Sequence, residues 1–275
     1  MADASRILML FDNMNRDYVS RLEKGARGYA AEKHLSVQVE NIFGTDQKAE
    51  KFLDQEGLGG VILTAPLCDD RHLMLQIEKR GLPFARIASM LDPGRGITVS
   101  MDEYEAARSV TALLLAAGHR AVGIIRGPRS HLSSMRRYNG FTAALGAKGV
   151  KLDPTLIVEG DYTREGGAEQ GAKLLAAGPS AIFASNDAMA LGLADAARRA
   201  GKSLPRDLSI VGFDDDPSAK TMNPPLTSVR QPLGDMGYKA CQLLAECMAG
   251  KRNGTAHVDV PFEIVERSSI APVGG

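Results

Sequence analysis

A strict alternation of short apolar strands and helices is the feature that most constrains the fold of this chain. It is clearest between Ser180 and Ser218, where the apolar runs Ala181–Ala184 and Leu208–Phe213 enclose an Ala- and Leu-rich helix expected from about Ala188 to Ala200. Strand, helix and strand at this spacing predict right-handed crossover units in a parallel sheet. In open sheets of this kind, ligands bind at the carboxyl ends of the strands.

The same alternation runs twice along the chain. The first half predicts strands at Arg6–Phe11, Ser36–Ile42, Gly60–Thr64, Phe84–Ala88 and Ile97–Met101, and helices at Asp17–His34, Asp46–Gln55, Asp69–Arg80 and Asp102–Ala117. The second half predicts strands at Ala121–Arg126 and Leu156–Gly160 and helices at Ser133–Lys148 and Arg164–Ala177, before the stretch described above. We therefore predict an α/β protein of two similar lobes, each built on a doubly wound parallel sheet.

Length and composition suit this interpretation. A chain of 275 residues is long enough for two lobes that each bury a core. Its 33 basic residues balance 33 acidic ones, so no net positive field draws it to phosphates, and we do not expect it to bind DNA by itself. It shows no signal-peptide pattern and no stretch of membrane-spanning length, which predicts a cytoplasmic protein without a membrane partner.

No catalytic or metal motif is recognisable in the sequence. Cys68, Cys241 and Cys247 lack the spacing of a metal site or a redox pair, and the five histidines are scattered. The segment Gly201-Lys202-Ser203 follows a predicted helix and lacks the first glycine of a phosphate-binding loop. We therefore expect neither an enzyme nor a cofactor.

Four ordered blocks carry a family resemblance. They read SNDAMALGLADAARRAG from Ser185, LPRDLSIVGFDD from Leu204, PPLTSVRQP from Pro224 and VERSS from Val265. Together they resemble the effector-binding core of the lactose/galactose repressor family, whose fold is similar to that of periplasmic sugar-binding proteins. The resemblance spans residues 6 to about 270. The helix-turn-helix with which those repressors begin has no match here, so we expect the DNA-binding domain to be absent from this chain.

The resemblance implies a particular division of the chain. The repeated alternation predicts a first crossing between the lobes near Gly118, and the resemblance implies two further crossings, near Gln231 and near Val258. The lobes would then be joined by three crossover strands of the type I periplasmic-binding-protein kind. The N-terminal lobe would then hold residues 5–117 and 232–258, and the C-terminal lobe residues 118–231 and 259–272.

The resemblance also implies a function and partners. A small polar effector, with sugar as the first expectation, would bind in the cleft between the lobes and change DNA affinity by lobe movement. The core would form a homodimer and reach operator DNA only through the missing helix-turn-helix. Met74, Leu75 and Ile77 are candidates for the dimer contact, although they could instead face the sheet. The alternative is a sugar-binding protein of a transport system, which shares the fold and the cleft.

Several predicted ligand-binding residues follow from the sheet-edge argument. Asp12, Asn13 and Asn15 come directly after the first strand, and either ligand contact or an Asx-turn with a helix cap would explain them. Asp102 opens a helix after the fifth strand, where ligand contact and N-capping are again both open.

The family resemblance adds five further residues. Arg137 matches an arginine of the family, and its planar fork suits adjacent hydroxyls or a carboxylate. Tyr162 matches an aromatic position that packs against effector rings. Asn186, Asp214 and Gln231 complete the implied site.

Two neighbouring acids are left outside this set. Asp215 and Asp216 are expected to cap the turn toward Pro217 or to face solvent.

Overall fold

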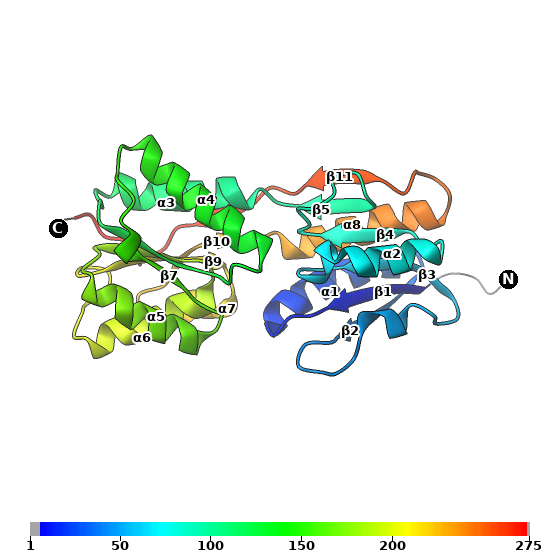
Figure 1. Cartoon of the computed structure of the whole chain (residues 1–275), viewed down its shortest axis with the longest axis horizontal. Helices are drawn as coiled ribbons and strands as arrows, with labels where there is room; N and C mark the ends of the chain where they lie inside the picture. Colours follow the sequence, from blue (N-terminus) through cyan, green and yellow to red (C-terminus); the bar gives the residue numbers. More distant parts are fainter. Residues whose placement is uncertain (1–5, 274–275) are drawn as a thin grey trace. The chain divides into compact units, whose positions relative to one another are not determined.

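The structure, a computed structural model, describes residues 6–273, which divide into two units. The first unit combines the residues up to Met101 with Pro232–Pro261, and the second combines Asp102–Gln231 with the segment that begins at Phe262. The chain therefore passes from one unit to the other three times. Each unit contains one six-stranded sheet with flanking helices, so the prediction of two α/β lobes with parallel-dominated sheets is confirmed (Figure 1).

The first unit is built on an all-parallel sheet in the order β11-β5-β4-β3-β1-β2. Its strands are β1 (Arg6–Phe11), β2 (Ser36–Asn41), β3 (Leu58–Leu63), β4 (Phe84–Ile87), β5 (Ile97–Ser100) and β11 (Ala256–Asp259). Its helices are α1 (Arg16–Glu32), α2 (Arg71–Lys79) and α8 (Leu233–Met248), with 3₁₀ turns η1 (Ala49–Phe52) and η2 (Leu67–Asp69).

Alternate side chains of this sheet face opposite helix layers. Leu8 and Leu10 of β1 belong to one apolar cluster with Leu73 and Met74 of α2. On β3, a side chain at Gly60 would meet Leu244 of α8. The helix α8 packs against α1 and against β3, β4 and β5. The helix α8 thus covers the face of the sheet opposite to α2.

The second unit is built on a sheet in the order β12-β10-β9-β8-β6-β7, in which only β12 is antiparallel. Its strands are β6 (Val122–Arg126), β7 (Ile157–Glu159), β8 (Ala181–Ala184), β9 (Ser209–Asp214), β10 (Thr227–Arg230) and β12 (Glu263–Val265). Its helices are α3 (Glu103–Ala116), α4 (Leu132–Ala147), α5 (Arg164–Ala176), α6 (Asp187–Arg199) and α7 (Pro217–Thr221), with the 3₁₀ turn η3 (Pro154–Leu156). The pairs α3/α4 and α5/α6 cover opposite faces of this sheet (Figure 1).

The first boundary between the units differs from the predicted one. We expected α3 in the N-terminal lobe, with a crossing near Gly118, but the second unit begins at Asp102. The cause is tight packing of α3 on α4, where a side chain at Gly140 would lie 2.2 Å from the Tyr104 carbonyl oxygen. The later crossings follow Gln231 and Pro261, the latter three residues beyond the predicted boundary at 258.

The predicted helix at Asp46–Gln55 is wrong. That segment contains only the single turn η1. Ala49, Phe52 and Leu53 are its buried apolar residues, and one 3₁₀ turn is enough to place all three in the core. Because helix nucleation is costly, a longer helix needs more apolar contact than this segment offers.

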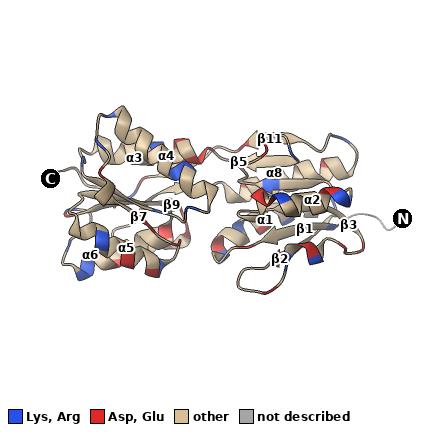
Figure 2. Cartoon of the chain, viewed as in Figure 1, with Lys and Arg blue, Asp and Glu red and all other residues tan. Residues whose placement is uncertain are grey.

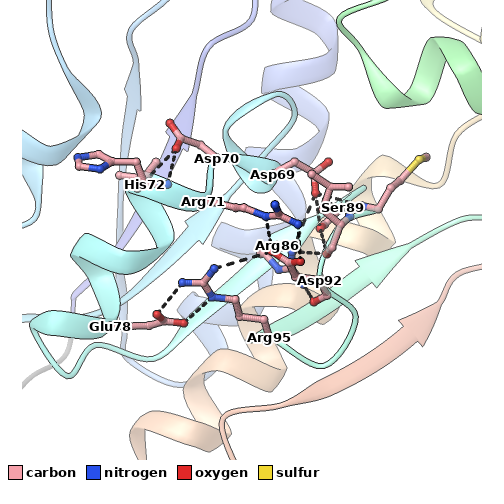
Figure 3. A network of polar contacts seen from close by, with 12 residues as sticks. Asp69, Asp70, Arg71, His72, Glu78, Arg86, Ser89, Asp92 and Arg95 are labelled. Atoms are coloured by element: carbon pink, nitrogen blue, oxygen red, sulfur yellow. Dashed lines mark hydrogen bonds and ion pairs between the residues drawn. The ribbon is translucent and has the colours of Figure 1, made fainter.

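A fully buried arginine fixes the loop between β4 and β5 (Figure 3). Arg86 donates from Nη1 to the Leu91 carbonyl oxygen (2.8 Å) and from Nη2 to that of Asp92 (2.9 Å). Asp69, whose carboxylate lies 4.0 Å from Arg86, accepts hydrogen bonds from the Met90 and Leu91 amides. On the outer side of the loop, the Asp92 carboxylate accepts two bonds from an arginine of α2. The loop and α2 are therefore held together as one surface.

Only one of the three dimer candidates on α2 is exposed. Met74 and Ile77 are fully buried against the sheet, whereas Leu75 is 47% exposed. For Met74 and Ile77 the alternative that they face the sheet therefore holds, and Leu75 alone stays a candidate for the dimer contact.

Charges of both signs are interspersed over both units (Figure 2). Within residues 6–273, no helix combines the length and apolar character needed to cross a membrane. No group of His, Cys, Asp and Glu side chains in the same residues could hold a metal ion.

Candidate functional site

Polar residues collect at the carboxyl edge of the second unit's sheet. The parallel strands β8, β9 and β10 end there, and Ser185, Asp214 and Gln231 stand at or directly after these ends. All three residues are buried. The sheet edge therefore carries a buried cluster of polar side chains, which is the place where ligands bind in sheets of this kind.

Arg137 of α4 lies at the centre of this edge. Its Nη1 donates to the Ser185 carbonyl oxygen (2.6 Å) and lies 4.0 Å from Asp214 Oδ1. Its Nη2 donates to Glu103 Oε1 (3.0 Å), and the guanidinium stacks 3.7 Å from the centre of the Phe213 ring. The arginine is only 5% exposed, so its charge is compensated mainly by protein groups.

Glu103 belongs to this cluster and was not among the residues predicted from the sequence. It is the first residue of α3 and is 2% exposed. Its Oε1 pairs with Arg137, while Oε2 is buried and has no hydrogen-bond partner among the described residues. The available signal was its position directly after Asp102, at a helix start that follows a strand end.

Asp214 is held in an unusual backbone conformation at the end of β9. Its φ of 114° lies in the left-handed region, which non-glycine residues rarely adopt. Gln231 donates from Nε2 to Asp214 Oδ1 at 2.6 Å. Burial raises the pKa of Asp214 to about 6, although the Arg137 guanidinium acts in the opposite direction.

A second buried acid holds the turn that follows Asp214. Asp187, at the start of α6, accepts hydrogen bonds from the Asp216 amide (2.9 Å) and the Ser228 hydroxyl (2.7 Å). The Ser228 oxygen in turn accepts from the Asp215 amide at 3.1 Å. Burial, followed by the nearby Asp214, raises the pKa of Asp187 well above its usual range. This network fixes the direction in which the Asp214 side chain leaves the strand.

Asp215 does not face solvent and does not cap the turn, contrary to our expectation. It is buried, and its carboxylate accepts hydrogen bonds from Arg230 Nε (2.7 Å) and from Arg267. Asp216 does cap α7, accepting a bond from the Ser218 amide at 2.8 Å.

Tyr162 and Asn186 lie next to each other at the same edge. Asn186 accepts a hydrogen bond from the Met189 amide (2.9 Å), which caps α6, and donates from Nδ2 to the Tyr162 carbonyl oxygen (3.0 Å). Tyr162 has a φ of 67°, and its ring packs so closely on Gly127 that a side chain there would overlap it. Burial raises the pKa of the Tyr162 hydroxyl, while Arg137 acts against this. Asn186 thus supports both the helix and the tyrosine.

Asp102 has a clear structural role. Its carboxylate accepts a hydrogen bond from the Glu105 amide (3.0 Å), as an N-cap does, and pairs with Arg136 at 3.4 Å. The residue is exposed at the start of α3.

The predicted residues of the first unit form a turn at the end of β1. Asn15 caps α1 by accepting hydrogen bonds from the Asp17 and Tyr18 amides. Asn13 Oδ1 accepts from the Asn15 amide, and Asn13 is joined through its backbone to the Asn41 side chain after β2. Asp12 is half-buried beside them. Asn13 and Asn15 therefore build this turn at the carboxyl edge of their own sheet.

Comparison with known proteins gives the family. Residues 111–270 match the model of the periplasmic binding protein-like domain. The chain is 30% identical over 274 residues to the HTH-type transcriptional repressor CytR of Escherichia coli K12, covering 97% of this chain and 80% of the repressor. This chain belongs to the LacI family of transcriptional regulators.

Solved structures of LacI-family regulators share the fold. A complex of the regulator CelR with cellobiose has a TM-score of 0.89 at 24% identity, covering 97% of this chain and 85% of that one. A LacI-family regulator from Enterococcus faecium with bound ribose has a TM-score of 0.88 at 24% identity, covering 98% and 99%. The present chain corresponds to the effector-binding domain of LacI-family regulators, and its relatives are regulators rather than enzymes.

Proposed function

We propose that this chain is the effector-sensing and dimerisation core of a LacI-type regulator that acts in the cytoplasm. It binds a small polar metabolite, in the first place a sugar, and movement of one unit against the other changes the DNA affinity of the full-length regulator. A helix-turn-helix outside the described residues contacts the operator. The sugars named with the two solved relatives support a sugar as the ligand.

The observation that carries this proposal is the buried polar cluster around Arg137. Three acceptor groups, Glu103, the Ser185 carbonyl and Asp214, surround one guanidinium at the carboxyl edge of a parallel sheet. The Ser185 hydroxyl and Glu103 Oε2 are buried without a hydrogen-bond partner in the described part of the chain. Buried polar atoms left unpaired are costly to a protein, so a ligand that pairs with them gains affinity from this edge.

A thermal-shift screen tests the proposal. The panel contains neutral sugars, amino sugars, sugar phosphates, sugar acids and nucleosides. A ligand at a hundred times its dissociation constant stabilises a protein by roughly 2.7 kcal/mol, which is readily detected as a rise in melting temperature. The same compound should change operator binding by the full-length regulator in a gel-shift assay. A panel that leaves the melting temperature unchanged would contradict the proposed function.

A further inference from the structure

The charge balance around Arg137 is negative. One guanidinium faces two carboxylates, those of Glu103 and Asp214, at 3.0 and 4.0 Å. Asp216 and Asp187 lie close enough to Asp214 for electrostatic coupling. The positive charge of Arg137 is therefore already balanced before a ligand arrives.

The other arginines of this edge are paired with carboxylates as well: Arg136 with Asp102 at 3.4 Å, Arg126 with Glu159 at 2.7 Å, and Arg230 with Asp215 at 2.7 Å. Two of these carboxylates are shared, Glu159 with the exposed Arg129 and Asp215 with Arg267, and Arg230 also pairs with Glu263. An incoming anion would thus find these arginines already paired and, next to Arg137, would have to be desolvated beside the carboxylates of Glu103 and Asp214.

The carboxylate of Glu103 has one oxygen, Oε2, that is free to accept a hydrogen bond from a ligand. It is held by Arg137 through Oε1, which fixes the direction of the carboxylate. Oε2 is buried and without a hydrogen-bond partner in residues 6–273. An ionised carboxylate only accepts hydrogen bonds, so the partner that satisfies Oε2 must bring an O–H or N–H group.

We infer that the ligand is an uncharged or cationic polyhydroxy compound that donates hydrogen bonds to Glu103 Oε2 and to the Asp214 carboxylate, and that Glu103 rejects phosphorylated and carboxylated analogues. This inference rests on the proposed function and narrows its ligand class. Arg137 acts in it as a positioning residue, because it orients the two acceptors, while Glu103 determines specificity.

Calorimetry with matched sugars tests the inference. The probes are D-glucose with D-glucosamine, D-glucuronate and D-glucose 6-phosphate, and D-ribose with D-ribose 5-phosphate. For whichever series binds, the neutral or amino member should bind at least about tenfold more tightly than its anionic counterpart, as expected for one unbalanced charge at short range. An anionic member that binds the wild-type protein as tightly as its parent would overturn the inference while leaving the proposed function standing. If no member of either series binds, the same comparison of a neutral compound with its anionic counterpart is made for the compound found in the thermal-shift screen, and equal affinities there overturn the inference.

Two variants separate Glu103 from the general charge of α3. Glu103→Gln keeps the shape and removes the charge, so the preference against the anionic member should shrink by about tenfold. Glu105→Gln is the matched control, because Glu105 lies on the same helix, is exposed and pairs with Arg108. An unchanged ratio in Glu103→Gln, or an equal change in the control, assigns the selectivity elsewhere. If Glu103→Gln fails to fold, the wild-type ratios alone decide.

Discussion

At the residue scale, we expect the buried pair of Arg137 and Glu103 to affect the free energy of unfolding. Removing only the cation leaves a buried carboxylate without its partner, so Arg137→Met should lower the free energy of unfolding by about 3–5 kcal/mol. The double variant Arg137→Met/Glu103→Gln should lose less than the sum of the two single variants. Urea denaturation measures all three, and additive losses would show that the two side chains do not act as a pair.

We expect Asp214 to make both stability and ligand affinity depend on pH. Its pKa of about 6 lies above the ordinary value of 3.8. The stability that this carboxyl contributes is therefore present at low pH and is lost as pH rises through about 6. Ligand affinity should show the opposite trend, because the carboxylate is the stronger hydrogen-bond acceptor. In the wild type, ligand affinity should rise between pH 5 and pH 7. In Asp214→Asn, ligand affinity should not change with pH, and at pH 7 it should be roughly tenfold lower than in the wild type. Calorimetry at both pH values checks this, and a parallel pH trend in the variant would contradict it.

The sequence indicated part of the site and missed part of it for physical reasons. Asp214 directly follows the apolar run Leu208–Phe213, so a strand end can be recognised there from the sequence, whereas Arg137 and Gln231 were predicted only from the family resemblance. Glu103 was missed because the helix start at Asp102 already explained an acidic cluster. The burial of Asp215 depends on Arg230 and Arg267, which are distant in the sequence, and local patterns do not report such partners.

At the element scale, the seam between α5 and α6 requires glycine. A side chain at Gly192 would lie 1.9 Å from the Arg164 carbonyl oxygen, so Gly192→Ala should force the helices apart and destabilise by about 2 kcal/mol or more. Gly146→Ala on α4 is the matched control, since no atom lies within 4 Å of a side chain there. Helix propensity predicts that this control gains about 0.5–1 kcal/mol. Equal melting temperatures for the two variants would contradict the close packing.

His119 connects strand starts of the second sheet to the C-terminal segment. Its Nδ1 lies 2.9 Å from the Ser180 hydroxyl, and its Nε2 lies 3.0 Å from the Ala271 carbonyl oxygen. Because that carbonyl only accepts, Nε2 carries the proton of the neutral ring. Burial lowers the pKa of His119, so its contribution to stability is present above the unfolded pKa of about 6.5 and is lost as pH falls through the folded value.

The consequence is a pH-dependent difference between two variants. Between pH 7 and pH 5, the wild type should lose more unfolding free energy than His119→Gln, which cannot titrate. His72→Gln serves as the control, because the His72 side chain is 68% exposed. Denaturant titrations at the two pH values give the comparison, and identical losses in all three proteins would exclude a role for His119.

Element prediction from sequence worked where apolar periodicity was strong. Most strands and helices begin and end within a few residues of the predicted positions, as in β1 and β8, where the predicted and observed bounds coincide. The helix expected at Asp46–Gln55 failed because its period was helical but its apolar contact was too small. The assignment of α3 failed because the sequence shows that a helix is amphipathic without showing which sheet it covers.

At the scale of the whole molecule, a homodimer through α2 is the testable assembly. The loop between β4 and β5 and α2 form one surface held by Arg86 and Asp69, and Leu75 is its exposed apolar residue. Leu75→Glu should weaken self-association at least about tenfold in sedimentation experiments, because burying an unpaired charge is costly. Met135→Glu is the control, since Met135 is exposed to a similar degree, 49%, on the second unit. A monomeric wild type at micromolar concentration would refute the dimer.

The discontinuous make-up of the first unit has a consequence for synthesis on the ribosome. All the helices of the second unit are translated in one uninterrupted stretch, whereas α8 of the first unit is translated only after that stretch is finished. Until then, the part of the first sheet that α8 covers, formed by β3, β4 and β5, has no cover. We expect the nascent chain to expose this apolar face throughout translation of the second unit, and therefore to be most prone to aggregate or to recruit chaperones in that interval.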